Sequence, residues 1–186
     1  MARSATGTGK NSRTRILDAA ADLVATSGVD ALTFDGLAEA TAISKGGILY
    51  HFGTKRELLE SLVQEGVDRF EALWDDHLER DDPTPGRQAR TYLSATLTIT
   101  GATFNFAFLA AAAADPTVMK PLVDAYVRWQ RRLTSDGVDE AVATTLRLVA
   151  DGLWAADMFR LPPLADSVAD GITQLLADLT RSPRPR

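Results

Sequence analysis

Between residues 45 and 51 the chain places a lysine, two glycines, a tyrosine and a histidine close together: Lys45, Gly46, Gly47, Tyr50 and His51. A lysine ammonium can reach a guanine edge or a phosphate, and tyrosine and histidine can donate hydrogen bonds to phosphate oxygens. Glycine at a helix start costs roughly 0.5–1 kcal/mol relative to alanine, so the pair needs an explanation. The glycines either add flexibility or let a helix end approach base edges closely. Tyr50 and His51 are either DNA contacts or ordinary exposed residues.

Two short helices with a tight turn between them are predicted to position these side chains. Thr33 is typical of the N-cap of one helix, the helical pattern breaks at residues 42–43, and Ser44 is typical of the next N-cap. Ile48 and Phe52 lie four residues apart and place one face of the second helix in the core. These signals predict a helix-turn-helix. The two capping hydroxyls either act as caps alone or also contact DNA phosphate.

The flanking helices are predicted from apolar spacing and capping residues. Ser12 is typical of the N-cap of a first helix, whose apolar face repeats at helical spacing until Gly28 ends it in a left-handed conformation. The segment Thr54–Glu57 has capping-box spacing and opens a long helix that should run to about Arg80. Residues 1–11 lack periodicity and indicate a flexible basic arm, which is either a solubilising tail or a further DNA contact.

Beyond residue 80 the chain is predicted to form five more helices. Turn-forming residues separate them in the loop 81–86, at Gly101, at Asp115-Pro116, at Ser135–Gly137 and at Leu161–Pro163. No persuasive alternating strand, hairpin signal or internal repeat is found in the sequence. We therefore expect an all-α fold with about nine helices.

The overall composition limits the classes of function. The 186 residues are 45% apolar and carry a net charge of −5, although residues 1–17 hold four basic residues and no acidic one. Cysteine is absent, which excludes disulfides and thiolate chemistry and suits a reducing cytoplasm, and neither a signal peptide nor a membrane span is evident. The two histidines, His51 and His77, are far apart and form no metal-binding pair. An enzyme is disfavoured, and we expect no cofactor and no metal.

The segment AISKGGILYHFGTKRELL and the preceding LTFDGLAEAT resemble the N-terminal signature of the TetR family of bacterial transcriptional regulators. The resemblance covers roughly residues 12–65, and beyond them only the helical layout and the length agree. It implies a homodimer that reads a palindromic double-stranded DNA operator with its third helix in the major groove, and a C-terminal domain that binds a small-molecule effector. The expected divisions are a flexible basic arm at 1–11, a helix-turn-helix DNA-binding domain at 12–56, a ligand-binding and dimerisation domain at 57–181 and a tail at 182–186.

The DNA contacts are expected from the helix-turn-helix and from the start of the helix that follows. The expected residues are Thr33, Ser44, Lys45, Gly46, Gly47, Leu49, Tyr50, His51 and Lys55. Tyr50, His51 and Lys55 match the family's positions, whereas the position before Tyr50, commonly aromatic in the family, is Leu49. Lys55 is unfavourably placed for the dipole of its own helix, and a nearby phosphate would explain it.

Two sets of residues in the C-terminal half are candidates for a ligand pocket and for a dimer interface. The pocket candidates, whose alternative is an ordinary place in the core, are Phe104, Phe108, Met119, Tyr126, Trp129, Trp154 and Met158. The interface candidates, whose alternative is burial within one subunit, are Val142, Leu146, Val149, Leu153, Val168, Ile172, Leu175 and Leu179. We expect a repressor that its effector releases from the operator, with activation left open. The alternative is a helical small-molecule-binding or scaffold protein without operator binding.

Overall fold

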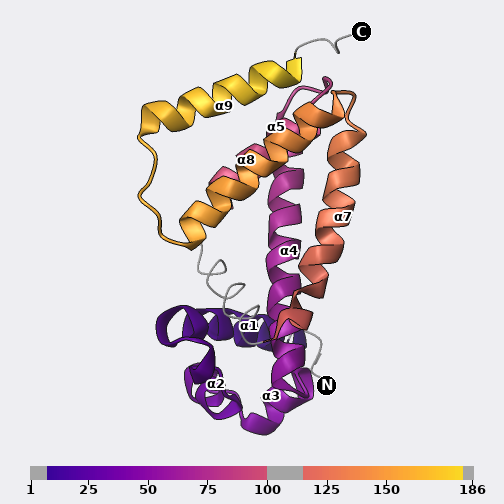
Figure 1. Cartoon of the computed structure of the whole chain (residues 1–186). Coiled ribbons are helices and arrows are strands. Elements are labelled where there is room, and N and C mark those ends of the chain that lie inside the picture. Colours follow the sequence, from indigo (N-terminus) through magenta and orange to yellow (C-terminus); the bar gives the residue numbers. More distant parts are fainter. Residues whose placement is uncertain (1–7, 100–114, 182–186) are drawn as a thin grey trace. The chain divides into compact units, whose positions relative to one another are not determined.

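The computed structural model describes residues 8–99 and 115–181, and every regular element in these ranges is helical (Figure 1). The α-helices are α1 (Thr8–Ser27), α2 (Phe34–Thr41), α3 (Lys45–His51), α4 (Lys55–Arg80), α5 (Arg87–Ile99), α7 (Lys120–Thr134), α8 (Glu140–Met158) and α9 (Asp166–Arg181). Two 3₁₀ helices are η1 (Val29–Ala31) and η2 (Pro116–Met119). The prediction of an all-α fold is confirmed, with eight α-helices in the described residues against about nine expected.

The chain divides into two compact units, and both α4 and α7 run through the division. The described residues of the first unit are 8–66 and 115–122, and those of the second unit are 67–99 and 123–181. Each unit buries its own set of apolar side chains.

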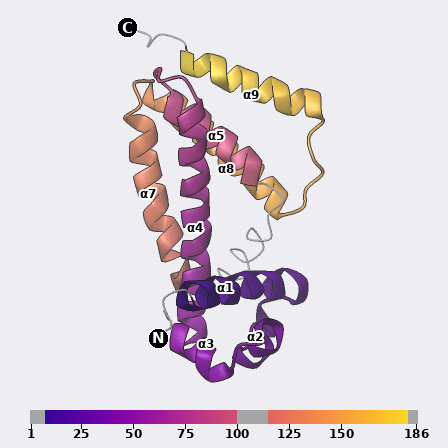
Figure 2. The ribbon, with the colours of Figure 1, turned by 180° about the vertical axis from the view of Figure 1, so that it is seen from behind.

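In the first unit, α1 packs against α2 and against η1, the short 3₁₀ helix that precedes α2, and α3 packs against α2 (Figure 2). The predicted anchors of α3, Ile48 and Phe52, are buried, and so are Ile16, Leu17, Ala20 and Val24 of α1 and Leu37 of α2. Three other apolar residues of the same two helices, Leu23, Phe34 and Ala38, are half-buried. Gly28 follows α1 with a φ of 80°, the positive value that the sequence predicted and that glycine adopts without penalty. Ser12, however, is not an N-cap. The helix begins at Thr8, because residues 8–11 contain no proline to stop it from extending past Ser12.

Helix α4 starts and ends where the sequence predicted. The Glu57 N–H donates to Thr54 Oγ1 at 3.1 Å, and Glu57 Oε2 accepts a hydrogen bond from the Gly53 N–H at 2.8 Å. The glutamate therefore reaches back one residue further than in a regular capping box, where it would bind the N–H of Thr54. The apolar residues predicted for α4 are buried: Leu58, Leu59, Leu62, Val63, Val67, Phe70 and Trp74.

In the second unit, α5 lies against α8 and α9, and α8 runs alongside it in both views (Figures 1 and 2). Phe70 and Trp74 of α4 meet Tyr92 of α5 and Trp129 of α7 in an aromatic cluster. Neighbouring ring centroids in this cluster lie between 4.8 and 6.1 Å apart. Such spacings are those of tilted and edge-to-face pairs, which add to the stabilisation from burial alone.

The predicted interruptions of the C-terminal helices are confirmed where the structure describes them. The chain leaves regular helix at 135–139 and again at 159–165, around the two segments that the sequence indicated. The Asp115 side chain accepts from the Thr117 N–H at 2.9 Å, as an N-cap does, but Pro116 opens the 3₁₀ helix η2 rather than an α-helix. The predicted break at Gly101 lies outside the described residues.

Candidate nucleic-acid interface

Side-chain caps set the starts of α2 and α3, as predicted. Thr33 Oγ1 accepts from the Gly36 N–H at 3.0 Å, and Ser44 Oγ accepts from the Gly47 N–H at 3.1 Å. Between the two helices Ala42 has a φ of 54°, a left-handed conformation that turns the chain sharply. The two caps satisfy backbone donors that would otherwise lack a partner, so the turn and both helix starts are fixed locally.

Helix α3 has one buried face and one open face. Ile48 and the following Phe52 are buried, which fixes the helix on the core of the first unit. On the other side Tyr50 is 86% exposed, Leu49 and Lys45 are exposed, and His51 is half-buried with its ring edge-on to Tyr50. A phenol on a rigid helix with so much of its surface in water is available to a partner.

The two glycines of α3 differ in their surroundings. A Cβ added at Gly46 would have no atom within 4 Å outside its own helix, whereas one at Gly47 would lie 3.0 Å from Ile43 Cγ2 and 3.3 Å from Ser44 Oγ. Gly47 is thus explained by packing inside the turn. Gly46 is not, because nothing among the described residues requires the missing side chain there.

Both lysines expected at the interface have partners within the chain. Lys45 Nζ lies 2.9 Å from Asp35 Oδ2, with the lysine side chain 52% exposed and the aspartate 76% exposed. Lys55 Nζ donates to the Val29 carbonyl oxygen at 2.9 Å, and this carbonyl offsets its unfavourable place at the start of α4. Both ammonium groups remain at the surface and can exchange these partners for others.

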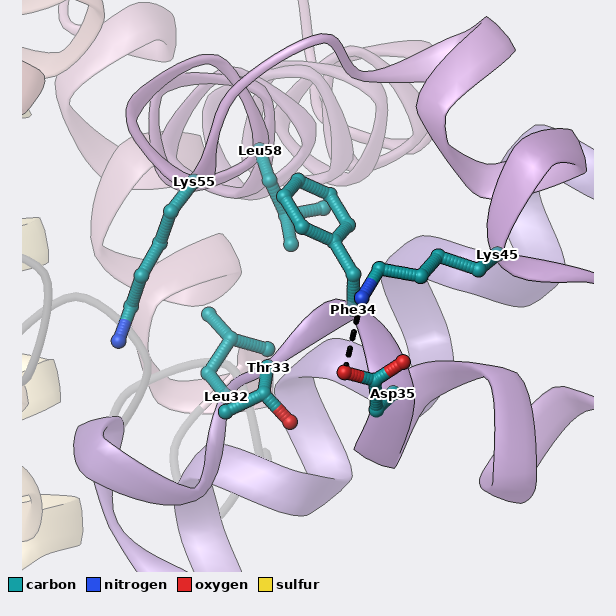
Figure 3. A pocket seen from close by; sticks show the side chains of 7 residues that line it. All are labelled: Leu32, Thr33, Phe34, Asp35, Lys45, Lys55 and Leu58. Atoms are coloured by element: carbon teal, nitrogen blue, oxygen red, sulfur yellow. Dashed lines mark hydrogen bonds and ion pairs between the residues drawn. The ribbon is translucent and has the colours of Figure 1, made fainter.

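A hollow of about 310 Å³ lies between the starts of three helices (Figure 3). We call it the lysine hollow, and its lining residues are Leu32, Thr33, Phe34, Asp35, Lys45, Lys55 and Leu58. The two lysines enter from α3 and α4 on different sides, while the Phe34 ring and Leu58 form its apolar floor. Because α2, α3 and α4 all begin here, the positive ends of three helix dipoles add to the two lysine charges.

Two arginines of α1 bind to the helix-turn-helix itself. Arg15 Nη2 donates to the Thr41 carbonyl oxygen at 2.7 Å, at the end of α2, and the Arg13 guanidinium lies 5.2 Å from the centroid of the Phe52 ring. Neither contact was predicted from the sequence. The basic residues before Asp18 indicate a positive charge, and nothing in their spacing points to a carbonyl or a ring as partner. Residues 1–7 of the expected flexible arm lie outside the described residues.

Of the predicted pocket residues, two are seen to be neighbours. Phe104 and Phe108 lie outside the described residues, and Met119 belongs to the first unit. Tyr126 and Trp129 are neighbours, with ring centroids 5.0 Å apart, while Trp154 and Met158 are half-buried in α8. Trp129 is largely buried, and its indole N–H donates to Glu71 Oε1 at 2.8 Å.

A largely buried polar network, which was not predicted from the sequence, joins α5, α7 and α8 in the second unit. Asp151 Oδ1 accepts hydrogen bonds from the Tyr92 hydroxyl at 2.8 Å and the Tyr126 hydroxyl at 3.1 Å, and Asp151 Oδ2 binds Arg147 Nη1 at 2.7 Å. Burial raises the pKa of the Asp151 carboxyl, against the opposite effect of these donors, and burial likewise raises the pKa of both tyrosines.

The predicted interface set divides by exposure. Leu146 is only 1% exposed and packs within its own subunit, so its assignment to a surface between subunits is wrong. The physical reason is that helical spacing shows that a face is covered, but not which neighbour covers it. Val168, Leu175 and Leu179 of α9 are exposed. Val142, Val149, Leu153 and Ile172 are half-buried. Large exposed apolar residues of the second unit that the prediction did not include are Leu97, Val123, Val127, Leu148, Phe159, Leu161 and Leu164.

Two parts of the chain match known protein families. Residues 16–62 match the family described as "Bacterial regulatory proteins, tetR family", and residues 86–181, just over half of the chain, match "Tetracyclin repressor-like, C-terminal domain". The chain belongs to the TetR family. The resemblance seen in the sequence is therefore confirmed, and the second match extends it to the C-terminal part, where the sequence alone had offered only the helical layout.

Curated TetR-type relatives match over the N-terminal part only. The uncharacterized HTH-type transcriptional regulator TtgW of Pseudomonas putida is 33% identical over 63 residues, which are 34% of this chain and 47% of TtgW. The HTH-type transcriptional regulator SrpR, also of Pseudomonas putida, is 32% identical over 63 residues, which are 34% of this chain and 30% of SrpR. The chain thus matches less than half the length of each of these relatives.

Solved structures match over nearly the whole chain. A transcriptional regulator from Streptomyces coelicolor A3(2) has a TM-score of 0.70 at 19% identity, covering 92% of this chain and 99% of that one. A TetR-family regulator from Rhodococcus sp. has a TM-score of 0.70 at 20% identity, covering 93% and 100%. The multidrug binding protein EbrR, in complex with malachite green, has a TM-score of 0.63 at 21% identity, covering 90% and 97%. These likenesses show that the fold is that of TetR-family regulators.

Metal sites and membrane spans are absent from the described ranges 8–99 and 115–181. Within them, no three His, Cys, Asp or Glu side chains are grouped so that they could hold a metal ion. Within the same ranges, none of the helices combines the length and the apolar character needed to cross a membrane.

Proposed function

We propose that this TetR-family chain is a transcriptional repressor that binds a palindromic DNA operator as a homodimer and is released by a small-molecule effector. The observation that carries the proposal is the open face of α3, where Tyr50 stands 86% exposed on a helix fixed by buried Ile48 and Phe52. A short helix held in this way can enter a major groove without distorting the core that supports it.

In this proposal the lysine hollow takes a DNA phosphate. Three helix starts and the Lys55 ammonium group lie around it, and helix N-termini with lysines are common phosphate ligands in proteins. Lys45, which is paired with Asp35, is directed to a base edge. Tyr50 and His51 bind phosphates or base edges beside it, with Leu49 in apolar contact with a thymine methyl or a sugar. Gly46, whose missing side chain has no role among the described contacts, allows the backbone of α3 to come close to the bases.

Two copies are needed for specific binding, because one seven-residue helix reads too few bases. We assign the DNA-binding domain to residues up to about 56 and the ligand-binding and dimerisation domain to residues 57–181. Exposed apolar residues on α9, with Leu148 on α8, supply a surface that a second copy can cover. The symmetric dimer presents two α3 helices to successive major grooves.

An effector bound in the C-terminal domain changes the preferred spacing of the two α3 helices and so releases the DNA. The shared fold with EbrR, which was solved with malachite green, supports a pocket for an aromatic small molecule in this chain. Tyr126 and Trp129, whose rings are neighbours, are candidates to line such a pocket.

The proposal is tested by measuring the affinity of the full chain for an operator selected from random duplexes. Tyr50→Ala is expected to weaken binding at least tenfold, the loss from about one good contact, without lowering the melting temperature. Lys45→Ala should also weaken binding, whereas Lys120→Ala removes the same charge outside the helix-turn-helix and should have a smaller effect. A chain that selects no duplex, or whose affinity is unchanged by Tyr50→Ala, contradicts the proposal and favours a scaffold or small-molecule carrier.

A further inference from the structure

We propose that Asp35 is a specificity-determining residue for DNA binding, because it holds the Lys45 ammonium at the start of α3 and withdraws it from DNA phosphates. The proposal rests on the proposed function. Lys45 Nζ and Asp35 Oδ2 are 2.9 Å apart across the mouth of the lysine hollow, and Figure 3 shows the lysine extended from α3 to the carboxylate on α2. A carboxylate at a surface built to bind a polyanion needs an explanation.

The stability of the fold does not provide one. The lysine is 52% exposed and the aspartate 76% exposed, and ion pairs in such positions contribute little to folding. The carboxylate is favourably placed in the first turn of α2, so Asp35 needs no cation there. The lysine stands in the first turn of α3, where a positive charge is unfavourable for the helix dipole, and Asp35 offsets that charge.

The effect of Asp35 differs for phosphates and for base edges. A phosphate that binds Lys45 must either displace Asp35 or lie close to its negative charge, and like charges at an interface oppose binding. A guanine edge offers O6 and N7 acceptors without a formal charge, and an ammonium has three donors. Lys45 can therefore bind Asp35 and a guanine at the same time. The carboxylate thus weakens binding to any DNA backbone more than binding to the correct base.

A substitution that keeps the shape of Asp35 and removes its charge separates these effects. The substitution is Asp35→Asn, and its control is Glu39→Gln. The control removes the same charge from another exposed position of α2 but leaves the ion pair between Lys45 and Asp35 in place. Affinity is measured by fluorescence anisotropy at several salt concentrations, for the selected operator and for a scrambled duplex of the same length and composition. The same measurements are made for Lys45→Ala and for Asp35→Asn combined with Lys45→Ala.

Asp35→Asn is expected to tighten binding to the scrambled duplex about fivefold and binding to the operator less than about twofold. The salt dependence of the affinity for the scrambled duplex should become steeper, by the amount expected when about one more counterion is released, because Lys45 becomes available to a phosphate. Glu39→Gln should leave the ratio of the two affinities unchanged, and Lys45→Ala should abolish the effect of Asp35→Asn.

Equal changes in Asp35→Asn and Glu39→Gln overturn this proposal alone, because a general charge effect then explains both. An effect of Asp35→Asn that persists with Lys45→Ala also overturns it. If the wild-type chain selects no operator, the proposed function fails and this proposal fails with it.

Discussion

Two aspartate–cation pairs in this chain have similar distances and different surroundings. Lys45–Asp35 in the first unit spans 2.9 Å with both side chains more than half exposed. Arg147–Asp151 in the second unit spans 2.7 Å with side chains 19% and 21% exposed, and two tyrosine hydroxyls complete the coordination of the carboxylate. The same chemistry therefore serves two purposes, which burial separates: the exposed pair can exchange partners at little cost, and exchange costs more for the half-buried pair, whose carboxylate also binds two tyrosine hydroxyls.

The difference in exposure between the two pairs indicates which unit can bind a charged partner and which unit uses its ion pair to join helices. In the first unit, Lys45 and Lys55 donate to an exposed carboxylate and an exposed carbonyl oxygen. Contacts at the surface such as these leave both ammonium groups within reach of a DNA group. In the second unit, Asp151 joins α5, α7 and α8 through groups that water reaches poorly.

The largest effect is expected for Asp151→Ala. The substitution leaves Arg147 without its carboxylate and the Tyr92 and Tyr126 hydroxyls without their acceptor, which should lower the free energy of unfolding by about 3 kcal/mol. Urea denaturation monitored by circular dichroism measures it.

The matched control is Asp35→Ala, which breaks the exposed pair. It should change the free energy of unfolding by less than about 0.5 kcal/mol. Equal losses for the two variants would show that burial does not separate the pairs, and the contrast between the two units would be wrong.

A smaller loss is expected for Ser44→Ala, which removes the side-chain acceptor at the start of α3. The expected cost is about 1 kcal/mol, the usual value of an N-cap, together with weaker DNA binding because α3 is less firmly held. Ser44→Thr keeps the hydroxyl and should remain close to wild type in both measurements. A Ser44→Ala chain as stable as the wild type would mean that packing of Ile48 alone fixes the helix.

The smallest effect, and one of opposite sign, is expected for Gly46→Ala. The added methyl group meets no atom within 4 Å outside its helix, so the free energy of unfolding should rise by about 0.5 kcal/mol through helix propensity, while operator binding weakens. Gly47→Ala should not gain stability, because its Cβ would press on Ile43. Tighter operator binding by Gly46→Ala would rule out a close approach of the backbone to the bases.

The sequence predicted the parts of this structure that depend on local signals. Thr33, Ser44 and Gly28 were assignable because caps and positive-φ positions select particular residues. The buried face of α4 followed from helical spacing. Contacts between residues far apart in sequence were not predictable in this way, among them the Arg15 bond to Thr41 and the convergence of Tyr92, Tyr126 and Asp151.

The predictions for Leu146 and Ser12 were wrong because helical spacing and residue type do not determine which neighbour covers a face or where a helix begins. Leu146 has the spacing of an interface residue, but spacing shows only that a face is covered, and here its own subunit covers it. Ser12 has the type of an N-cap, but α1 begins at Thr8, because a serine does not stop a helix from extending past it. The nine expected DNA contacts and the remaining interface positions stay predictions.

The most direct test of the central claim, that two copies of α3 read DNA, is selection of bound fragments from a random duplex pool by the wild-type chain. The account predicts enrichment of a palindrome whose half-site centres lie about one helical turn apart, roughly 34–36 Å, or a multiple of it. It also predicts that Tyr50→Ala enriches no such sequence under the same conditions. Recovery of no enriched sequence, or of one without two-fold symmetry, would contradict it.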